Sequence, residues 1–489
     1  MRYLVIVIIC LIFNSICLGQ ISFFNFYTNN GADFGQGIIQ LEDSSYVLTG
    51  SSSSFGNGPS QAFLMQIDSM GNYLWSKSYG GVESESGRRV LYKKDFGYFI
   101  CGYSNSNLLG DFDFYLAKVD TLMNLEWDNT YGGDGWERIN DAVLTSDTGT
   151  LLVGETSSNI TNNLDIYIVR TNKFGDTLWT KTIGGSGDDK ANCITSYDDS
   201  TYFIGGQYYL EDSLQVKGYM MYLKDDGTII WQETIPTANE HWVNDIVIDN
   251  SNSSKVVGVG GGRKSSNDIE PYYFIYDDAP NQSFIGDYHE SKPGDEYYTE
   301  ITSFGSNGDY YISYVDNTGT GYPYGEDIQI HRRQSNWVYV PPGCPLSHPY
   351  PDYVGDIIST SDGGAIVVGY TTGVISGGNE IMIAKIGPSS LYPDNINDYT
   401  INNVVILENI DLSNLVTLYP NPSSGEVNLV SETNMYEKFR ILSSKGNIVE
   451  SGIFNQNLKL DFSLEEIGIY FIELIGSKVI PVRIKLVIN

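Results

Sequence analysis

Cysteine and histidine are scarce in this chain, which limits the chemistry that its side chains can perform. The 489 residues include 5 Cys and 4 His. Beyond the N-terminal leader described below, an odd set of cysteines remains, Cys101, Cys193 and Cys344, which cannot form a complete disulfide framework. We expect small buried apolar thiols. The sequence also lacks a Gly-x-Ser-x-Gly elbow, a His-Glu-x-x-His zinc helix and a phosphate-binding loop, which excludes the enzymes built on these motifs.

Basic residues are also few. Lys and Arg total 28 against 60 Asp and Glu, which gives a formal net charge of -32. No stretch gathers basic side chains into a stripe that could neutralise phosphates, so nucleic acid is not an expected partner. Arg is too sparse in the predicted inner strands to suggest a sialidase-type carboxylate clamp. The acidity would favour cations or basic ligands if it were concentrated at one place.

Long apolar runs are rare, and the clearest one lies at the N-terminus. Met1-Arg2-Tyr3 is followed by an apolar run from Leu4 to Phe13. A short basic start and a run too short to span a bilayer predict a signal peptide over residues 1–19, cleaved after Gly19. Cys17 offers the alternative of a lipoprotein, although the residues before it match a lipidation site poorly. No later run suits a transmembrane helix, so we expect no transmembrane segment in the mature chain.

What the sequence does contain is a repeat, together with abundant Gly and Tyr (52 and 37 residues). Three kinds of marker recur every 52 residues: single tryptophans, single glycines and glycine pairs. They are Trp75, Trp127, Trp179 and Trp231; Gly50, Gly102, Gly154 and Gly206; and Gly80-Gly81, Gly132-Gly133 and Gly184-Gly185. The agreement of three markers in one register indicates a structural repeat.

Each repeat predicts short strands. β-branched and aromatic runs at 141–145, 150–156, 166–171 and 177–183 are separated by Gly, Asn and Asp. Four short strands in each period are the signature of a β-propeller blade. A turn such as Asp68-Ser69-Met70-Gly71 predicts a tight hairpin in which Gly supplies the positive φ, and the Trp that follows covers packing between blades.

Weaker copies of the first strand, near 243–248, 298–303 and 354–360, bring the predicted number of blades to seven. The last copy ends after its third strand, 381–386, whereas residues 21–28 look like a fourth strand placed before the first copy. Pairing these two segments would close the ring and remove its exposed edges. The sequence therefore predicts an all-β fold, with a seven-bladed propeller of four-stranded blades over residues 20–387. The repeat resembles those of secreted bacterial propellers.

Beyond the repeats, residues 388–417 are rich in Asn, Asp, Ser and Pro, which indicates a linker. Residues 418–489 then contain an ordered series of motifs. These are Leu418-Tyr419-Pro420-Asn421-Pro422-Ser423-Ser424-Gly425, Gly468-Ile469-Tyr470-Phe471 and the final Lys485-Leu486-Val487-Ile488-Asn489. In these residues the chain resembles the C-terminal sorting domain of the type IX secretion system of Bacteroidetes.

The resemblance implies a small immunoglobulin-like β-sandwich that the type IX secretion machinery reads. It also implies passage through the periplasm to the outer cell surface or the medium, commonly with proteolytic removal of the domain. The sorting-motif residues are then Tyr419, Pro420, Asn421, Pro422, Gly425, Gly468, Tyr470 and Lys485. The alternative is an ordinary accessory sandwich.

Alignment of the repeats places a polar residue at one equivalent position of every copy. These residues are Asp33, Glu85, Glu137, Asp189, His241, Glu296 and Asp352. Because they lie where an outer strand connects to the next inner strand, we expect them to surround the channel on one face. Carboxylates gathered there suit a hard cation such as Ca²⁺, or a basic ligand. The alternative is that each carboxylate accepts backbone N–H bonds within its own repeated turn.

Aromatic residues of the loops on the same face form a second candidate site. The loops between second and third strands contribute Tyr208, Tyr209, Tyr322 and Tyr324, and the connections between blades contribute Trp136, Trp242, Tyr350 and Tyr353. Such rings could form platforms for sugars. The alternative is that they are ordinary surface or packing residues, since Tyr is common throughout.

Together these features predict a non-enzymatic protein, released or held at the cell surface, that binds a glycan, a protein or a surface polymer. The alternative is a glycan-active hydrolase or lyase that uses carboxylates near the channel. A third alternative is a structural component of a surface layer. A buried acidic pair in an open pocket would favour the hydrolase, and turn-bound carboxylates would favour the binding protein. We identify no cofactor apart from the Ca²⁺ considered above.

Overall fold

The computed structural model describes most of the chain between residues 23 and 488. The described ranges are 23–28, 31–54, 56, 58–106, 111–159, 163–236, 240–263, 268–289, 295–316, 327–346, 351–372, 378–388, 404–406, 416–423, 425–431, 436–443, 448–462, 467–476 and 479–488. The predicted signal peptide lies outside these ranges, as do Tyr322, Tyr324 and Tyr350.

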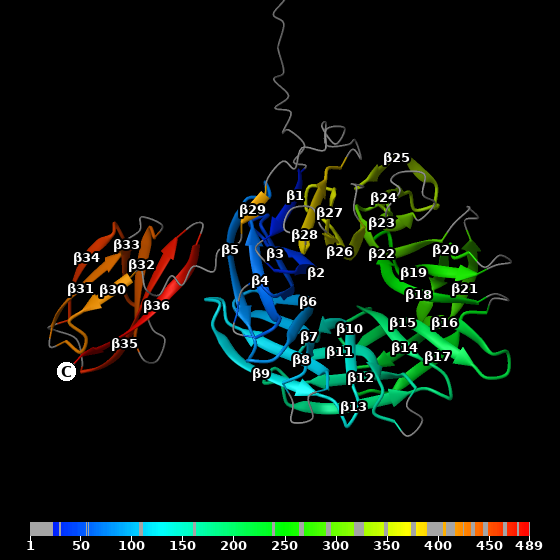
Figure 1. Ribbon diagram of the computed structural model, residues 1–489, viewed down its shortest axis with the longest axis horizontal. Coiled ribbons are helices and arrows are strands. Elements are labelled where there is room, and N and C mark those ends of the chain that lie inside the picture. The colour runs from blue at the N-terminus through cyan, green and yellow to red at the C-terminus, as the bar shows by residue number, and fades with distance from the viewer. Residues whose placement is uncertain are drawn as a thin grey trace, which may run out of the picture.

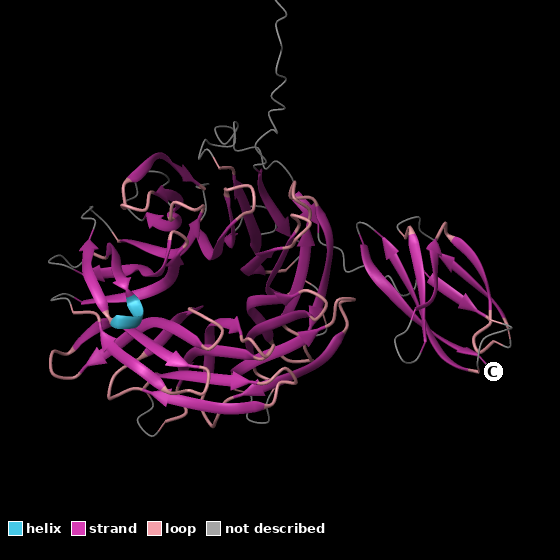
Figure 2. Cartoon of the chain, turned by 180° about the vertical axis from the view of Figure 1, so that it is seen from behind, coloured by secondary structure: helices cyan, strands magenta, loops and turns pink. Residues whose placement is uncertain are grey.

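Small sheets form a ring around a channel (Figures 1 and 2). We number them as blades in chain order, and each is given from its innermost strand outward. Blade 1 contains β2 (Asp33–Gln40), β3 (Tyr46–Ser52), β4 (Gln61–Ile67) and β5 (Tyr73–Tyr79). Blade 2 contains β6 (Glu85–Lys93), β7 (Gly97–Ser104), β8 (Asp113–Val119) and β9 (Leu125–Tyr131). Blade 3 contains β10 (Glu137–Leu144), β11 (Thr150–Thr156), β12 (Asp165–Thr171) and β13 (Thr177–Ile183).

The later blades follow the same order. Blade 4 contains β14 (Lys190–Ser196), β15 (Thr201–Leu210), β16 (Gln215–Lys224) and β17 (Ile229–Thr234). Blade 5 contains β18 (Glu240–Asp249), β19 (Asn252–Arg263), β20 (Glu270–Asp278) and β21 (Ser283–His289), with the 3-10 helix η1 (Ala279–Asn281) before β21. Blade 6 contains β22 (Glu296–Phe304), β23 (Asp309–Asp316), β24 (Asp327–Arg333) and β25 (Tyr339–Pro345). Blade 7 contains β26 (Asp352–Ser359), β27 (Ala365–Thr372), β28 (Asn379–Ile386), β1 (Phe23–Thr28) and β29 (Val404–Ile406).

Strands from opposite ends of this region close the ring. β1 lies antiparallel beside β28, with Phe23 opposite Lys385 and Tyr27 opposite Ile381. The predicted closing pair of strands is therefore confirmed for residues 23–27, which lie opposite 381–385. β29, from the predicted linker, adds to β1 as a parallel strand. Blade 7 is thus built from both ends of the ring region.

β1 makes the same contacts as an ordinary outermost strand. Its Tyr27 stands 52 residues before Tyr79 of β5, which stands 52 residues before Tyr131 of β9. The hydroxyls of Tyr27, Tyr79 and Tyr131 donate hydrogen bonds to the carbonyl oxygens of Gly71, Met123 and Gly175 at 2.5, 3.1 and 2.7 Å. Each acceptor lies in the outer hairpin turn of the next blade, so the repeated tyrosine ties neighbouring blades together.

The predicted hairpin turn is present between β4 and β5. Asp68 Oδ1 accepts hydrogen bonds from the backbone N–H groups of Met70 and Asn72, both at 2.9 Å. Gly71 follows with a φ of +80°, in the left-handed region that glycine adopts without strain. Trp75 then lies 6% exposed in β5, where it packs between blades 1 and 2. The turn therefore sets the register that places the repeated Trp.

Apolar clusters between neighbouring blades form the core of the ring. At the closing joint, Tyr27 of blade 7 packs with Ile38 and Met65 of blade 1 and with Val368 of blade 7, all of them buried. Burial of each such side chain contributes roughly 1.5–3 kcal/mol to folding. Because blades pack against both faces of a sheet, every residue of β3 and of β8 is buried, polar residues included.

Every innermost strand carries a bulge near its middle, which positions the candidate site. The pairing of the innermost with the second strand shifts after Gly35, Gly87, Ile139, Ala191, Val243, Tyr298 and Val354. An extra residue at a bulge bends the strand and redirects the side chains beside it. The unpaired residues are Gln36, Arg88, Asn140, Asn192, Asn244, Thr299 with Glu300, and Gly355.

The C-terminal residues fold into two further sheets with their own core. One sheet contains β30 (Val416–Tyr419), β31 (Glu426–Ser431) and β34 (Asn457–Asp461). The other contains β33 (Ile448–Ile453), β32 (Lys438–Ser443), β35 (Gly468–Gly476) and β36 (Val479–Ile488). Val427, Phe439, Ile472 and Leu486 are among the buried residues that both sheets contribute. The predicted all-β architecture with repeated four-stranded sheets is thus confirmed, whereas the exact domain boundaries stay predictions.

Candidate functional site

The repeated polar residues lie at or beside the start of each innermost strand, and we call them the first ring. They are Asp33, Glu85, Glu137, Asp189, His241, Glu296 and Asp352. All are buried. The structure therefore places them at equivalent positions of the blades, as the repeat predicts.

Hydrogen bonds from their own surroundings hold several of the first-ring carboxylates. In the repeated glycine pairs, the second glycine donates its N–H to the acid four residues later: Gly81 to Glu85 at 3.0 Å, Gly133 to Glu137 at 3.0 Å and Gly185 to Asp189 at 2.8 Å. Hydroxyl groups add to this. Ser52 and Ser54 donate to Asp33, Ser104 and Ser106 donate to Glu85, and Thr156 and Ser158 donate to Glu137.

These bonds show the turn-bound arrangement that the sequence offered as an alternative. The hydroxyls belong to a motif, Ser/Thr-x-Ser at the end of the second strand, that also recurs every 52 residues and that the sequence analysis missed. Among the rest, Glu296 accepts a hydrogen bond from the Tyr314 hydroxyl, and the ring of His241 lies 4.7 Å from that of Tyr272. In the described ranges no group of three or more His, Cys, Asp or Glu residues could hold a metal ion. Binding of Ca²⁺ or of a basic ligand stays a prediction.

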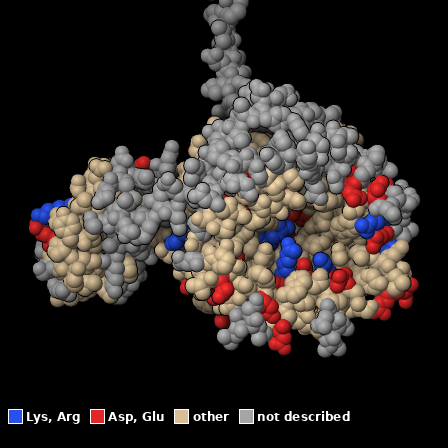
Figure 3. Space-filling model, in the orientation of Figure 1, with Lys and Arg blue, Asp and Glu red and all other residues tan. Residues whose placement is uncertain are grey.

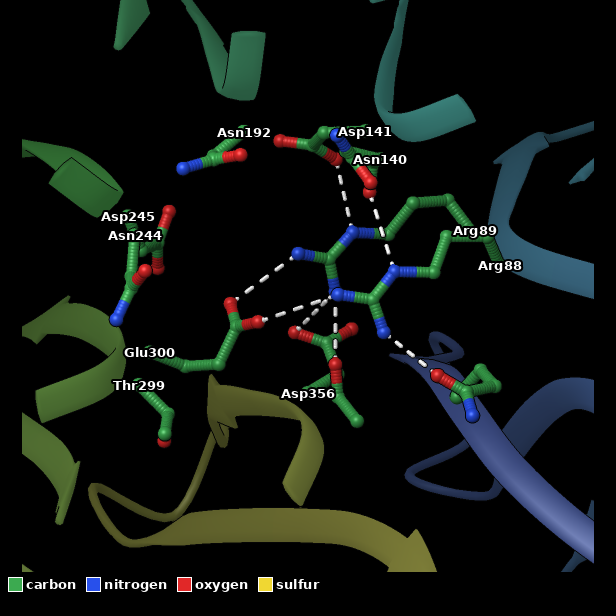
Figure 4. A network of polar contacts seen from close by, with 12 residues as sticks. Arg88, Arg89, Asn140, Asp141, Asn192, Asn244, Asp245, Thr299, Glu300 and Asp356 are labelled. Atoms are coloured by element: carbon green, nitrogen blue, oxygen red, sulfur yellow. Dashed lines mark hydrogen bonds and ion pairs between the residues drawn. The ribbon is translucent and has the colours of Figure 1, made fainter. Parts of the chain in front are cut away.

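A charged network fills the centre of the channel, four residues beyond the first ring (Figure 4). Arg89 of β6 reaches carboxylates of three other blades. Its Nε lies 2.8 Å from Asp141, its Nη2 lies 3.1 Å from Glu300 and its Nη1 lies 2.9 Å from Asp356. The neighbouring Arg88 donates to Gln36 at 2.6 Å and to the Asn140 carbonyl at 3.3 Å. One guanidinium thus joins blades 2, 3, 6 and 7 across the channel, as the close-up shows.

Burial and charge shift the pKa values in this network. Burial alone would lower the pKa of Arg89, but the carboxylates of Asp356, Glu300 and Asp141 outweigh it and raise that pKa well above its ordinary value. Burial, and then the nearby Glu300, raises the pKa of Asp245 well above its usual range. Burial also raises the pKa values of Glu300 and Asp356, against the effect of Arg89. Arg89 thus opposes the effect of burial, which would otherwise raise the pKa values of Glu300 and Asp356 further.

Side chains at and beside the bulges also tie each blade to the next. Asn140, Asn192 and Asn244 donate through Nδ2 to the carbonyl oxygens of Ala191, Val243 and Tyr298, at 3.0, 2.7 and 2.7 Å. Asp141, Asp245 and Asp356 accept from the backbone N–H groups of Ile194, Ile301 and Ile38, at 2.9, 2.8 and 3.1 Å. The recurrence of Asn every 52 residues was a sequence signal for this ring of contacts. These polar groups of the channel thus join neighbouring blades.

A hollow of about 720 Å³ lies where blades 3 and 4 meet. It is lined by Asn163, Ser186, Gly187, Asp188, Gln207, Tyr209, Glu211, Leu214 and Val216. The long hairpin of β15 and β16 forms one wall, and the turn between β13 and β14 forms another. The Tyr209 ring packs directly over Gly187. The space is so tight that a Cβ added to this glycine would come within 2.3 Å of the ring. The lining combines an aromatic ring, two amides and two carboxylates.

A first-ring acid lies directly beside this hollow. Asp189 accepts hydrogen bonds from the N–H groups of Tyr209 at 2.6 Å and Gly185 at 2.8 Å. Burial is the main cause that raises its pKa from 3.8 to about 6, and the neighbouring Asp165 and Asp188 add to the rise. Burial also raises the pKa of Asp165. Sequence reasoning pointed to Asp189 through the repeat, but nothing in the repeat indicated the hollow.

The structure describes only part of the predicted aromatic platforms. Tyr209 lines the hollow, Trp136 is 41% exposed, and Trp242 is half-buried beside Gly261. Tyr322, Tyr324 and Tyr350 are outside the described residues. Their part in binding stays a prediction.

The sorting-motif residues come together in the C-terminal sheets. Asn421 Oδ1 accepts a hydrogen bond from the N–H of Val487 at 3.0 Å, which joins the first motif to the last. Tyr419 and the exposed Pro420 and Pro422 lie beside this joint, and Tyr419 is 54% exposed. Gly425 is buried, and its N–H donates to Ser423 at 3.1 Å. Gly468 begins β35, where Tyr470 packs against Phe462, and Lys485 lies in β36 opposite Phe471.

A ring of four-stranded antiparallel sheets around a channel, closed by a strand from the N-terminal end, defines a β-propeller. The chain is therefore a propeller protein with a second, smaller β domain. Residues 417–489 match the family described as the secretion system C-terminal sorting domain. The protein accordingly carries a type IX secretion sorting domain. This domain implies secretion or placement at the outer surface, with the type IX machinery as a partner. In the described part of the chain, no helix is long and apolar enough to cross a membrane.

Similar folds occur among solved structures. The propeller domain of the Trilobed protease from Pyrococcus furiosus has a TM-score of 0.40 and 10% identity, over 78% of this chain and 97% of that one. The α-L-arabinofuranosidase Arb93A from Fusarium graminearum has a TM-score of 0.42 and 10% identity, over 76% and 99%. Raptor from Chaetomium thermophilum has a TM-score of 0.46 and 8% identity over 75% of this chain, but only 29% of Raptor is covered. No curated protein matches the sequence. These likenesses concern the fold alone.

Proposed function

We propose that this exported protein is a binding protein whose propeller recognises a saccharide of a glycan or surface polymer. The hollow between blades 3 and 4 carries the proposal. Its volume of about 720 Å³ lies within the usual range for small-molecule sites. The Tyr209 ring offers a flat apolar surface for the C–H face of a sugar, while Gln207, Asp188 and Glu211 offer groups that bond sugar hydroxyls.

The rigid surroundings of the hollow support a binding role. Asn163 Nδ2 donates to the carbonyl oxygen of Gly185 at 3.0 Å, and the N–H of Leu164 donates to Asp188 at 3.0 Å. These bonds fix the turn between blades 3 and 4 against blade 3. A wall that is already ordered loses little conformational entropy when a ligand binds.

The proposal is tested by screening the purified chain on a glycan array and repeating each positive by calorimetry with the variants Tyr209→Ala and Glu211→Gln. We expect each variant to weaken binding by about tenfold, the effect of one lost aromatic or charged contact. Phe174→Ala, at an exposed aromatic residue outside the hollow, is the matched control and should bind like the wild type. Equal binding by all variants would show that the hollow is not the site. A silent array would reject a saccharide ligand.

A glycan-active hydrolase is the second candidate, and Asp189 favours it. An acid with a pKa of about 6 beside a second carboxyl, Asp165, keeps its proton in mildly acidic solution, as a general acid requires. Asp189 is, however, fully buried and bonded to two backbone N–H groups. Incubating the array's positive glycans with the chain and analysing the products separates the two candidates. Cleavage that disappears in Asp189→Asn would establish the hydrolase.

A further inference from the structure

The residues directly after the first ring surround one end of the channel, and we call them the mouth ring. In blade order they are Phe34, Ser86, Arg138, Lys190, Trp242, Tyr297 and Tyr353. Arg89 and Asp141 stand three positions after Ser86 and Arg138, so the charged network lies up to about 10 Å deeper along the innermost strands. The charged network around Arg89 therefore lies below the mouth ring in the channel.

Two neighbouring blades give the mouth ring a basic side. Arg138 of blade 3 is exposed, and Lys190 of blade 4 is half-buried. Together with Arg88 they act on one buried carboxyl, that of Glu155, whose pKa burial raises and these three cations lower. Asn140 also donates a hydrogen bond to Glu155. Arg88 also lies 3.9 Å from Glu300, so it acts on two carboxylates, whereas Arg138 and Lys190 act on Glu155.

This basic side contrasts with the rest of the molecule. The formal net charge is -32, yet Figure 3 shows Lys and Arg side chains gathered in the central hollow of the ring. A concave site with cations at its wall concentrates the field and draws anions toward it. Lys and Arg side chains are therefore concentrated at the centre of the ring, beside the carboxylates of the charged network, although the chain as a whole is acidic.

The other side of the mouth ring is aromatic. Blades 5, 6, 7 and 1 contribute Trp242, Tyr297, Tyr353 and Phe34, all of which are half-buried. The set is continuous at the closing joint, because the Tyr370 ring stacks on Tyr353 with centroids 4.7 Å apart and meets Phe34 edge-on at 4.8 Å. Rings that are packed on one side and accessible on the other are suited to stacking on the faces of sugars.

We infer that the mouth ring is a second binding site, which takes a polyanionic saccharide. Its sugar faces stack on Trp242, Tyr297 and Tyr353, and its carboxylate or sulfate groups pair with Arg138 and Lys190 across the channel. The site differs from the hollow in charge, because Asp188 and Glu211 line the hollow. Lys190 pairs in register with Gln207 of the hollow, so the two sites border each other and a polymer could occupy both. The inference goes beyond the proposed function, since it can hold whether or not the hollow binds sugar.

Calorimetry of the full chain with two polyanions and their neutral counterparts tests this inference. The probes are oligogalacturonate against its methyl ester, and dextran sulfate against dextran. We expect a polyanion to bind at least about tenfold more tightly than its neutral counterpart, because each charge-assisted bond contributes about 1.5–3 kcal/mol, and to bind more weakly as salt rises. Binding of oligogalacturonate would identify the recognised anion as a carboxylate, and binding of dextran sulfate would identify it as a sulfate. Failure of both arms, or equal affinity for the neutral probe, overturns the inference.

Variants connect the binding to the mouth. Arg138→Gln with Lys190→Gln should lose about tenfold or more in affinity and most of the salt dependence. Arg263→Gln with Lys173→Gln removes the same charge from exposed positions outside the mouth ring and should bind like the wild type. An equal loss of affinity in both double variants would show that the mouth ring is not the site. Loss of anion binding in the first double, with glycan binding in the hollow retained, separates this inference from the proposed function.

Discussion

Arg89 Nε lies 2.8 Å from Oδ1 of Asp141, which stands 52 residues later at the equivalent position of the next blade. Neighbouring copies of one repeat thus place a cation and an anion side by side at the channel centre. Because the same guanidinium also reaches Glu300 and Asp356, a single side chain forms ion pairs with carboxylates from three blades. The first consequence is for stability.

Replacing Arg89 with Gln should destabilise the propeller strongly. Removing one partner of a buried ion pair leaves uncompensated charge and costs about 3–5 kcal/mol. The free energy of unfolding, measured in urea, should fall by that amount. Lys94→Gln breaks only an exposed pair with Glu42 and should leave it nearly unchanged. A variant Arg89→Gln as stable as the wild type would show that the network carries no net stabilisation.

The loss in Arg89→Gln should also depend on pH. Without the guanidinium, the folded-state pKa values of Glu300 and Asp356 rise further above their unfolded values. The folded variant then binds protons that the unfolded chain releases, so its stability falls as pH rises. We expect a smaller difference from the wild type at pH 5 than at pH 8, measured by the same urea titrations. A larger difference at pH 5 would contradict this account.

Tyr27→Phe should weaken the closing joint. It removes the hydroxyl that donates to the Gly71 carbonyl and should cost about 0.5–1.5 kcal/mol. Tyr131→Phe removes the equivalent bond to Gly175 inside the ring and is the matched comparison. If β1 behaves as an ordinary outermost strand, the two variants lower the free energy of unfolding equally. No loss in Tyr27→Phe beside a clear loss in Tyr131→Phe would show that the joint is looser than the other blade contacts.

Asp189 should make the protein less stable as the pH rises from about 4 to 6. Its folded-state pKa of about 6 lies above the ordinary value of 3.8, so in this interval the folded protein holds a proton that the unfolded chain has released. This contribution to stability is present below pH 4 and is lost as the pH passes 6. Asp189→Asn should flatten the curve of unfolding free energy in that window.

Asp226 provides a control of opposite sign for this measurement. Its pKa is lowered by hydrogen bonds from Thr228, so its contribution is present above the ordinary pKa and is lost as the pH falls below it. Asp226→Asn should therefore alter the curve at the acidic end only. An unchanged slope between pH 4 and 6 in Asp189→Asn would refute the assignment to Asp189.

Arg170→Lys should destabilise blade 3 although the charge is kept. Arg170 is 1% exposed, and its guanidinium bonds both carboxylate oxygens of Asp225, at 2.8 and 3.0 Å, as well as Asp147 at 2.9 Å. A lysine ammonium cannot reproduce this fork, so about 1–3 kcal/mol of stability should be lost. Thermal unfolding followed by circular dichroism measures the loss. Arg263→Lys, at a more exposed pair with Glu240, should not move the midpoint.

Features that recur in the sequence could be predicted, because the constant spacing of 52 residues shows which positions of the copies are equivalent. Trp75 and the turn at Gly71 are clear examples, and the pairing of residues 21–28 with 381–386 followed from counting strands. The first ring was located in the same way. Its hydroxyl partners, such as Ser104 and Ser106 on Glu85, were overlooked although they recur with the same period.

The rest depends on distances that a sequence does not contain. Arg89 and Glu300 are 211 residues apart and meet only because the ring brings blades 2 and 6 to one axis. The hollow arises from the length of the hairpin around Tyr209 and Leu214, which departs from the repeat. The mouth ring combines single residues from separate blades, so its basic and aromatic sides appear only when the blades are placed in a circle.

The position of β1 also bears on when this molecule can become complete. β1 is synthesised before every strand from β2 to β28, yet its antiparallel partner is β28. A chain that stops anywhere before residue 386 therefore leaves its first strand without a full partner and its ring open. Such contacts between distant parts of a chain form late in folding. The sorting domain follows the last strand of the ring. A chain that has been synthesised as far as this domain therefore already contains both strands, β1 and β28, that close the ring.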